Sequence, residues 1–221
     1  MVDREGQGVL LVMTDVEPEH EDEFNLWYDT EHMSERMSVP GFLDVRRFQA
    51  ASGGLKYCAL YRTESIATFE SEAYRAKLAA QTDWSKRMLG TFVEPNRIVG
   101  CVGRSTGHGS GGWLAILRYD AAAWGDVEKR AALVSAIADA RGIVAVDELA
   151  AVPRLSGPVK EYRPVTVPVL KADDHLLLVE GSDTNAVAAE KLRAICEGFG
   201  VSATHLGIYS FSWGLPAPAA S

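Results

Sequence analysis

The chain has 221 residues, of which 47% are hydrophobic and 24% are charged, and its formal net charge at pH 7 is −8. This length suffices for one large domain or two small ones, and the composition is ordinary for a globular protein. Because phosphate binding needs a basic face, the acidic balance excludes nucleic acid as an expected partner.

The cysteines and the first residues indicate a compartment. Cys58, Cys101 and Cys196 are widely spaced and form no CxxC pair, which indicates reduced thiols in a cytosol. The start, MVDREGQG, is polar, and no apolar run reaches the ~18 residues of a membrane helix. We therefore expect a cytoplasmic protein with no membrane partner.

The first half of the chain alternates between strand-like and helix-like segments. Runs of branched and aromatic residues predict strands, and Gly53-Gly54 suits a tight hairpin turn. Longer polar segments predict helices, the second of them broken near Thr82-Asp83. In chain order we expect a strand Val9–Val16, a helix from Pro18 to about Ser38, strands Phe42–Gln49 and Tyr57–Arg62, a helix Ser65–Leu89 and a strand Arg97–Val102.

The second half repeats this βαββαβ order of elements with little residue identity between the halves. Gly142 and Gly200 follow its two helical segments, where a helix commonly ends. In chain order we expect a strand Trp113–Tyr119, a helix Ala122–Ala140, strands Ile143–Val152 and His175–Gly181, a helix Thr184–Phe199 and a strand Val201–Phe211.

The two halves predict two structural units joined by a linker. We expect a first ferredoxin-like unit at residues 1–104, a linker at 105–112 and a second unit at 113–215. The linker reads STGHGSGG, a composition typical of flexible connections. The second unit carries an insertion at about 153–173, in which Thr166–Leu170 is an extra strand or an extended arm. Residues 216–221 are expected to form a disordered tail.

These elements predict an α+β fold. A βαββαβ unit forms a four-stranded antiparallel sheet with both helices on one face, so the other face must also be buried. Two such units can bury those faces against each other, which predicts a sandwich or a barrel with pseudo-two-fold symmetry. A pocket is expected between a sheet and its helices or at the mouth of the barrel.

The first predicted helix carries the main candidate site. On an α-helical wheel His32 lies beside Asp29 and Tyr28. A carboxylate at this spacing can hold the tautomer of a histidine and raise its pKa, which is how a general acid or base is commonly poised. The alternative is a hydrogen-bonded or solvated helix face, with Trp27 in the core instead of in a pocket wall.

The strand after this helix carries two adjacent arginines. Arg46 and Arg47 point to opposite faces, because side chains alternate along a strand. A buried arginine needs a carboxylate, and Glu31 and Glu35 are the nearby candidates. The alternative is an exposed pair on an edge strand.

The sequence lacks several well-known catalytic motifs. It contains no HExxH, GxGxxG, GxxxxGK[ST] or GxSxG pattern. Its glycine-rich stretch precedes a predicted strand, so a phosphate site at a helix N-terminus is not expected there. These absences argue against a nucleotide-dependent enzyme, a zinc hydrolase and a serine hydrolase, and we expect no metal site.

The segment FNLWYDTEHMSERMSVPGFLDVRRF, residues 24–48, resembles proteins of the dimeric α/β-barrel superfamily, in the style of its EthD-like branch. The shared pattern is an aromatic pair and a histidine on the first helix, a Pro-Gly stop, and a strand with arginine. Most members have one ferredoxin-like unit per chain and dimerise, whereas this chain carries two. Whether it also forms a homodimer is left open. The second unit lacks the pattern, which implies a single working pocket in the first unit.

The spacing and the resemblance together predict a cofactor-independent enzyme of the isomerase, cyclase, decarboxylase or lyase type. Its substrate is expected to be small, oxygenated and partly apolar. His32 is the expected general acid or base, and Asp29 is its orienting group.

A further set of residues is expected to bind this substrate. Tyr28, which is also a catalytic candidate, and one of Arg46 and Arg47 would bind or polarise a carbonyl or carboxylate group. Trp27 and Tyr57 would line the pocket.

Three other functions stay open. The first is a cofactor-free monooxygenase on a phenolic substrate. The second is a haem protein, which needs an axial histidine from His32, His175 or His205. The third is a non-catalytic small-molecule-binding or scaffold protein.

Overall fold

The computed structural model describes residues 3–120, 127–157 and 174–216. Three expected features lie wholly or partly outside these ranges. They are the strand or arm at Thr166–Leu170, the start of the helix expected from Ala122, and the tail beyond Pro216.

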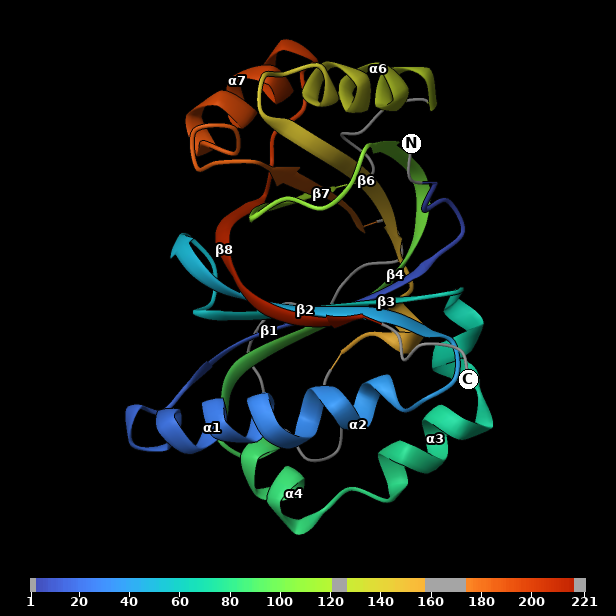
Figure 1. Cartoon of the computed structure of the whole chain (residues 1–221). Coiled ribbons are helices and arrows are strands. Elements are labelled where there is room, and N and C mark those ends of the chain that lie inside the picture. The colour runs from blue at the N-terminus through green and yellow to red at the C-terminus, as the bar shows by residue number, and fades with distance from the viewer. Residues whose placement is uncertain (1–2, 121–126, 158–173, 217–221) are drawn as a thin grey trace.

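Eight strands close into one barrel, in the order β1-β3-β2-β8-β5-β7-β6-β4 (Figure 1). All neighbouring pairs are antiparallel. The strands are β1 (Gly8–Val16), β2 (Phe42–Ser52), β3 (Tyr57–Thr63), β4 (Phe92–Gly107), β5 (Trp113–Asp120), β6 (Ile143–Ala151), β7 (Asp174–Gly181) and β8 (His205–Pro216).

Each half of the ring is a ferredoxin-like sheet. The first unit supplies the order β4-β1-β3-β2 and the second supplies β8-β5-β7-β6, so the two sheets correspond strand for strand. They join where β2 pairs with β8 and where β4 pairs with β6. Closure pairs each of the eight described strands on both sides, so the ring has no open sheet edge among them. The predicted α+β fold with tandem ferredoxin-like units is confirmed.

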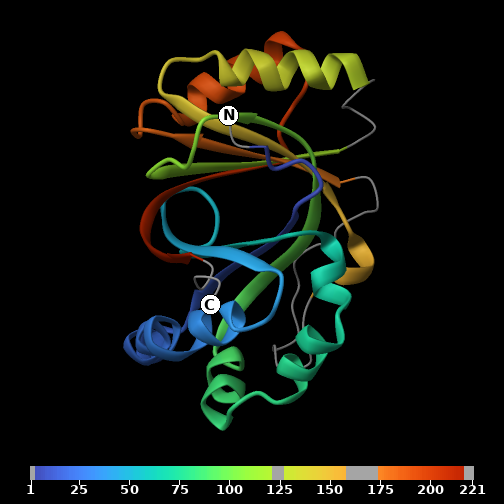
Figure 2. The ribbon, with the colours of Figure 1, turned by 45° about the vertical axis from the view of Figure 1, so that its right-hand side comes forward.

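The helices cover the outside of the ring in two separate layers. Figures 1 and 2 show α1 to α4 against the first sheet and α6 and α7 against the second. The helical segments are η1 (Pro18–His20), α1 (Glu21–Trp27), the π-helical η2 (Tyr28–His32), α2 (Met33–Met37), η3 (Ile66–Glu70), α3 (Glu72–Ala79), α4 (Asp83–Leu89), α6 (Val127–Ala138), η4 (Pro153–Leu155) and α7 (Ala189–Gly198). No described helix has the length and apolar character needed to cross a bilayer.

The predicted elements are all found within the described ranges, but some bounds differ. β4 extends to Gly107, which pairs with Ala145 of β6, so the start of the expected linker is part of a strand. The last helix begins at Ala189 instead of Thr184, and the last strand begins at His205 instead of Val201. Sheet pairing between the two units sets the strand lengths, and this pairing has no local signal in the sequence.

The lumen of the barrel contains both an apolar core and a cluster of charges. Its apolar part comes from both units and includes Leu11, Phe48, Leu60, Leu149 and Leu178. The charged residues share these strand faces, because side chains alternate along a strand. The lumen therefore joins the two units through side chains as well as through strand pairing.

The charge cluster, here called the lumen network, contains Arg4, Arg46, Arg62, Asp147 and Glu180. Arg46 donates two hydrogen bonds of 2.7 Å to the two carboxylate oxygens of Glu180. Arg62 donates to Asp147 at 2.7 Å. Arg4, close to the N-terminus, reaches Asp147 at 3.2 Å and Glu180 at 3.3 Å. All five residues are buried, so three cations of the first unit meet two carboxylates of the second.

The lumen network corrects the prediction for Arg46. Its partner is Glu180 of the second unit, not Glu31 or Glu35, and Arg46 and Arg47 are both buried instead of exposed. Burial raises the pKa of Glu180, but the hydrogen bonds from Arg46 and the nearby guanidinium charges outweigh burial and hold that pKa below its ordinary value.

We expect Glu180→Ala to lower the free energy of unfolding by about 3–5 kcal/mol, because it leaves buried guanidinium groups without their carboxylate. Urea unfolding measures the change. Glu70→Ala is the matched control, since Glu70 forms an exposed ion pair with Arg154, and its effect should be much smaller. Equal effects of the two substitutions would contradict a structural role for the lumen network.

Candidate functional site

His32 lies on a local distortion of the first helix. The segment Tyr28–His32 is π-helical, between α1 and α2. In an α-helix, residues five apart point about 140° away from each other. A π-turn closes its hydrogen bonds over five residues and so brings such pairs to one side. The ring centroids of Trp27 and His32 are accordingly 4.1 Å apart, with the rings tilted by 35°.

The same distortion separates His32 from Asp29. One oxygen of Asp29, Oδ1, accepts hydrogen bonds from Arg47 and from Trp213, both at 2.8 Å. Its side chain is 47% exposed, whereas His32 is buried. The predicted Asp29–His32 pair is therefore wrong in geometry, because the α-helical wheel does not apply across a π-turn.

The environment of His32 keeps its imidazole neutral. Burial is the main cause, and the charges of Arg36 and Arg47 act in the same direction, so the pKa of His32 lies well below its ordinary value. The prediction that a carboxylate raises this pKa is wrong. A neutral imidazole can accept a proton at pH 7, and an imidazolium cannot.

His32 lines a small cavity between the first sheet and its helices. The cavity volume is about 30 Å³. Three of the lining side chains are buried and have a polar atom with no hydrogen-bond partner in the described ranges: His32 Nδ1, Arg36 Nη1 and Gln81 Oε1. The other lining residues are Leu10, Val12, Tyr28, Tyr61, Tyr74, Leu78, Leu89, Phe92 and Arg97.

The cavity is too small for a substrate as it stands. Its volume suits about two water molecules, whereas ligand pockets usually measure about 300–1,000 Å³. Leu78 and Arg97 are its half-exposed lining residues. Gln81, in the connection between α3 and α4, forms another part of the wall. A ligand would therefore enter by displacing this connection or these side chains.

Two of the predicted site residues line the cavity and the others lie elsewhere. His32 and Tyr28 line it, and Trp27 packs on the ring of His32 while donating to Ser85 Oγ. The hydroxyl of Tyr57 faces the polar groups of α1.

The two arginines are both held away from the cavity. Arg46 belongs to the lumen network. Arg47 lies against the rings of Phe24, Tyr28 and Tyr57, with its guanidinium carbon 4.6–5.3 Å from their centroids. This arrangement fixes the first helix to β2. The guanidinium group of Arg47, which the sequence predicted as a possible substrate contact, is therefore already engaged by the protein.

Sequence reasoning missed four polar residues of the cavity, Arg36, Tyr61, Gln81 and Arg97. Arg36 follows His32 by four residues, a spacing that places both on one helix face, but Arg36 was not among the predicted site residues. Tyr61 lies on β3, the strand that also carries the predicted residue Tyr57. Gln81 carried no signal, because it lies in an irregular connection. Tyr74 of α3 also lines the cavity.

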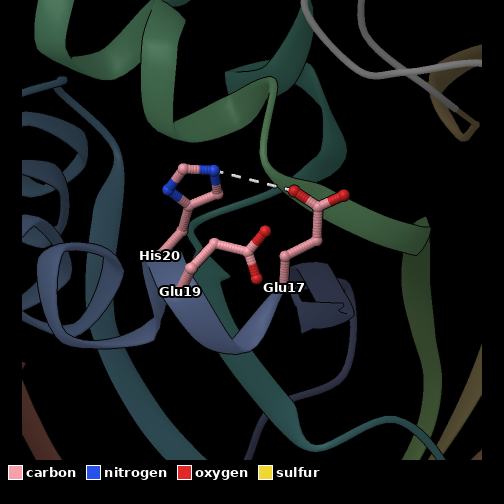
Figure 3. A group of neighbouring side chains, drawn as sticks. All are labelled: Glu17, Glu19 and His20. Atoms are coloured by element: carbon pink, nitrogen blue, oxygen red, sulfur yellow. Dashed lines mark ion pairs between the residues drawn. The ribbon is translucent and has the colours of Figure 1, made fainter.

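A second group of acid and imidazole side chains lies at η1 (Figure 3). Glu17, Glu19 and His20 bring their ligand-type atoms within 4.8 Å of one another, and His20 Nε2 lies 3.6 Å from Glu17 Oε2. The group is half-buried or exposed. Acidic surface groups of this kind are common without a metal, so we assign no metal site there.

The fold defines the class of protein. A closed ring of two βαββαβ units, with helices on the outside, is the dimeric α/β-barrel architecture, here contained in one chain. The predicted resemblance to that superfamily is confirmed for the fold. The EthD-like branch remains a prediction.

Comparison with known proteins agrees with this class. The sequence matches no protein-family model, and no curated protein matches it. An anthrone oxidase-like protein has a similar structure, with a TM-score of 0.60 at 10% identity over 97% of this chain and 94% of the other. A mutant chlorite dismutase from Candidatus Nitrospira defluvii has a TM-score of 0.59 at 10% identity, over 96% and 93% of the two chains.

A third similar structure corrects the expectation about cofactors. It is a heme-binding protein from Thermus thermophilus, with a TM-score of 0.53 at 11% identity over 94% of this chain and 91% of the other. The sequence predicts no cofactor, and this neighbour contradicts that prediction, because the same fold binds haem. These likenesses at about one residue in ten show the fold alone.

The cavity at His32 does not fit a haem as it stands. The cavity at His32 is about 30 Å³, and Trp27 covers one face of the imidazole. We therefore derive no step through haem.

The lowered pKa of His32 predicts a pH dependence of stability. The unfolded chain protonates this histidine below about pH 6.5, while the folded protein resists protonation. The contribution of His32 to the free energy of unfolding is therefore complete above about pH 6.5. It is lost as the pH falls towards the pKa that His32 has in the folded protein. In that window, the free energy of unfolding of the wild type should fall, relative to that of His32→Gln, by up to about 1.4 kcal/mol for each unit of pH.

Urea unfolding of both proteins from pH 8 to pH 4.5 measures this difference. Subtracting the free energy of unfolding of His32→Gln from that of the wild type removes the contributions of the other titrating groups. A difference that stays constant over the whole range would show that His32 titrates alike in the folded and unfolded chains.

Proposed function

We propose that the first unit contains the active site of an enzyme. This enzyme moves a proton from one atom of its small, oxygenated, partly apolar substrate, and His32 is the general base. One observation carries the proposal. His32, Arg36 and Gln81 line the same cavity, and each has a buried polar atom without a partner in the described chain. Buried polar groups normally have partners, so three such atoms at one cavity are a polar set available to a ligand.

The proposed step is the removal of a proton next to a carbonyl group or from a phenol. The neutral imidazole of His32 takes the proton and becomes a cation. The electron pair of the broken bond moves to the substrate oxygen, which becomes an enolate or phenolate. Return of the proton to another atom gives an isomer, and loss of a leaving group gives a lyase product.

Arg36 is placed to stabilise the oxygen that becomes negative. It lies one helical turn from His32, and its Nη1 is a buried donor without a partner within the described ranges. A buried donor aimed at developing charge contributes more than it would in water. The same charge adds to burial in keeping His32 neutral, so the imidazole is free to take a proton.

The wall of the cavity favours a substrate with a ring. Tyr28, Tyr61, Tyr74 and Phe92 supply aromatic surface, and Leu10 and Val12 of β1 supply aliphatic surface. The aromatic wall favours a second candidate function. In this function, O₂ oxygenates a phenolic substrate after the same proton removal. Oxygen uptake with phenolic compounds separates this candidate from isomerisation and elimination.

The test of the leading proposal is a substitution at His32. A panel of enolisable ketones, lactones and phenols is screened with the wild type by absorbance and by oxygen uptake. With any compound that is turned over, His32→Gln should lower kcat by about 10²–10⁴-fold, the usual contribution of a general base.

Asp29→Asn is the matched control on the same helix turn. Asp29 faces Arg47 and Trp213, so this variant should keep most of the activity. A His32→Gln variant that turns over as fast as the wild type would contradict the role of His32. Binding without turnover in the wild type would favour a non-catalytic binding protein.

The pH profile of the wild type should show a base with a low pKa. Because burial and two guanidinium charges lower the pKa of His32, kcat/KM should stay flat as the pH falls through about 6.5, the ordinary pKa of histidine. It should fall only at more acidic pH, where His32 becomes protonated. A profile that falls near pH 7 would point to a base other than this buried imidazole.

A further inference from the structure

We propose that Glu31 is a positioning residue, which fixes both the imidazole of His32 and the wall of the cavity that contains Gln81. The consequence for catalysis rests on the function proposed above. The positioning itself can be tested without a substrate.

Glu31 binds the N-terminus of α4 through two hydroxyl groups. Its Oε1 accepts a hydrogen bond of 2.6 Å from Thr82 and one of 3.1 Å from Ser85. Thr82 is also the N-cap of α4, because its Oγ1 accepts from the backbone N–H of Ser85 at 2.9 Å. One carboxylate oxygen therefore holds the first turn of α4 against the π-helical segment.

A chain of contacts connects this carboxylate to His32. Ser85, which donates to Glu31, accepts a hydrogen bond of 3.1 Å from Trp27 Nε1. Ser85 and Trp27 are both fully buried. Trp27 in turn stacks on His32 at 4.1 Å. The position of the imidazole thus depends on Trp27. The indole N–H of Trp27 donates to the hydroxyl of Ser85, and Glu31 fixes this hydroxyl.

The same carboxylate also holds the opposite wall of the cavity. Gln81 immediately precedes Thr82, so the bond from Thr82 to Glu31 fixes the backbone next to Gln81. Loss of that bond would free the connection between α3 and α4, which is the part of the wall that a ligand must displace. Glu31 therefore couples the closure of the cavity to the position of the base.

A second link between the same helices provides an internal comparison. Glu23 on α1 accepts from Trp84 Nε1 at 2.9 Å and from Arg87 at 2.6 Å, both on α4. This link is on the exposed side and does not pass through Trp27. Removal of either glutamate weakens the contact between α1 and α4, but only removal of Glu31 should disturb His32.

The test is a proton NMR titration of the imidazole of His32 in the full-length chain. In Glu31→Ala, water should reach His32, and its pKa should rise by about half a unit or more towards the ordinary value, because burial is the main cause of the lowered pKa. Glu31→Gln keeps an oxygen that can accept from Thr82 and Ser85, so it should restore the titration of the wild type. Glu23→Ala should leave the titration of His32 unchanged.

Three results would overturn the proposal. They are a wild-type titration in a folded Glu31→Ala protein, an equal shift in Glu23→Ala, and failure of Glu31→Gln to restore the wild-type curve. If Glu31→Ala does not fold, Ser85→Ala removes the hydroxyl that connects Glu31 to Trp27 and leaves the bond from Thr82 to Glu31 in place. This variant should shift the pKa of His32 in the same direction. Each outcome is independent of turnover, so a failure of the proposed catalytic role of His32 is recognised separately, by the activity of His32→Gln.

Discussion

The bidentate pair between Arg46 and Glu180, inside the barrel, is the interaction on which the rest of the structure depends. It joins two residues 134 positions apart, one from each unit. Burying charges is unfavourable unless their hydrogen bonds are satisfied, and removing one partner leaves the other uncompensated. The lumen network therefore couples the folding of each sheet to the presence of the other, in addition to the pairing of β2 with β8 and β4 with β6.

Ring closure also determines where a site can form. With its inner face filled by the apolar core and the lumen network, the first sheet has only its outer face available, and helices cover that face (Figure 1). The cavity lies in this layer, between β1, the helix that carries His32 and the connection that carries Gln81. The barrel is thus the support, and the proposed chemistry belongs to one helix and one connection outside it.

The π-helical turn arranges the residues of this helix. It stacks His32 on Trp27, directs Asp29 towards Arg47, and leaves His32 and Arg36 at the same cavity. A buried imidazole among guanidinium groups stays neutral, and a neutral base beside a cation is suited to proton removal that leaves a negative oxygen. The distortion is a local feature, yet it decides which residues can act together.

The fold was largely predictable from the sequence, because its signals are local. Branched runs such as Val9–Val16 marked the strands, Gly53 and Gly54 do adopt positive φ in the hairpin turn, and the break at Thr82 does separate α3 from α4. The repeated βαββαβ order was then enough to predict two sheets that bury each other's inner faces.

The site was predictable only in part, since it depends on non-local and irregular features. Sequence proximity suggested Glu31 or Glu35 as the partner of a buried arginine, while the barrel supplied Glu180 to Arg46. The π-turn that removes Asp29 from His32 has no pattern of its own in one sequence.

The central claim is that His32 removes a proton from a small oxygenated substrate. Deuterium exchange measures this event directly. Enolisable ketones and phenols are incubated with the protein in D₂O, and incorporation of deuterium next to the carbonyl group or on the ring is followed by NMR. The account predicts incorporation with the wild type that is much faster than in buffer and is lost in His32→Gln. Incorporation at the same rate in both proteins would contradict it.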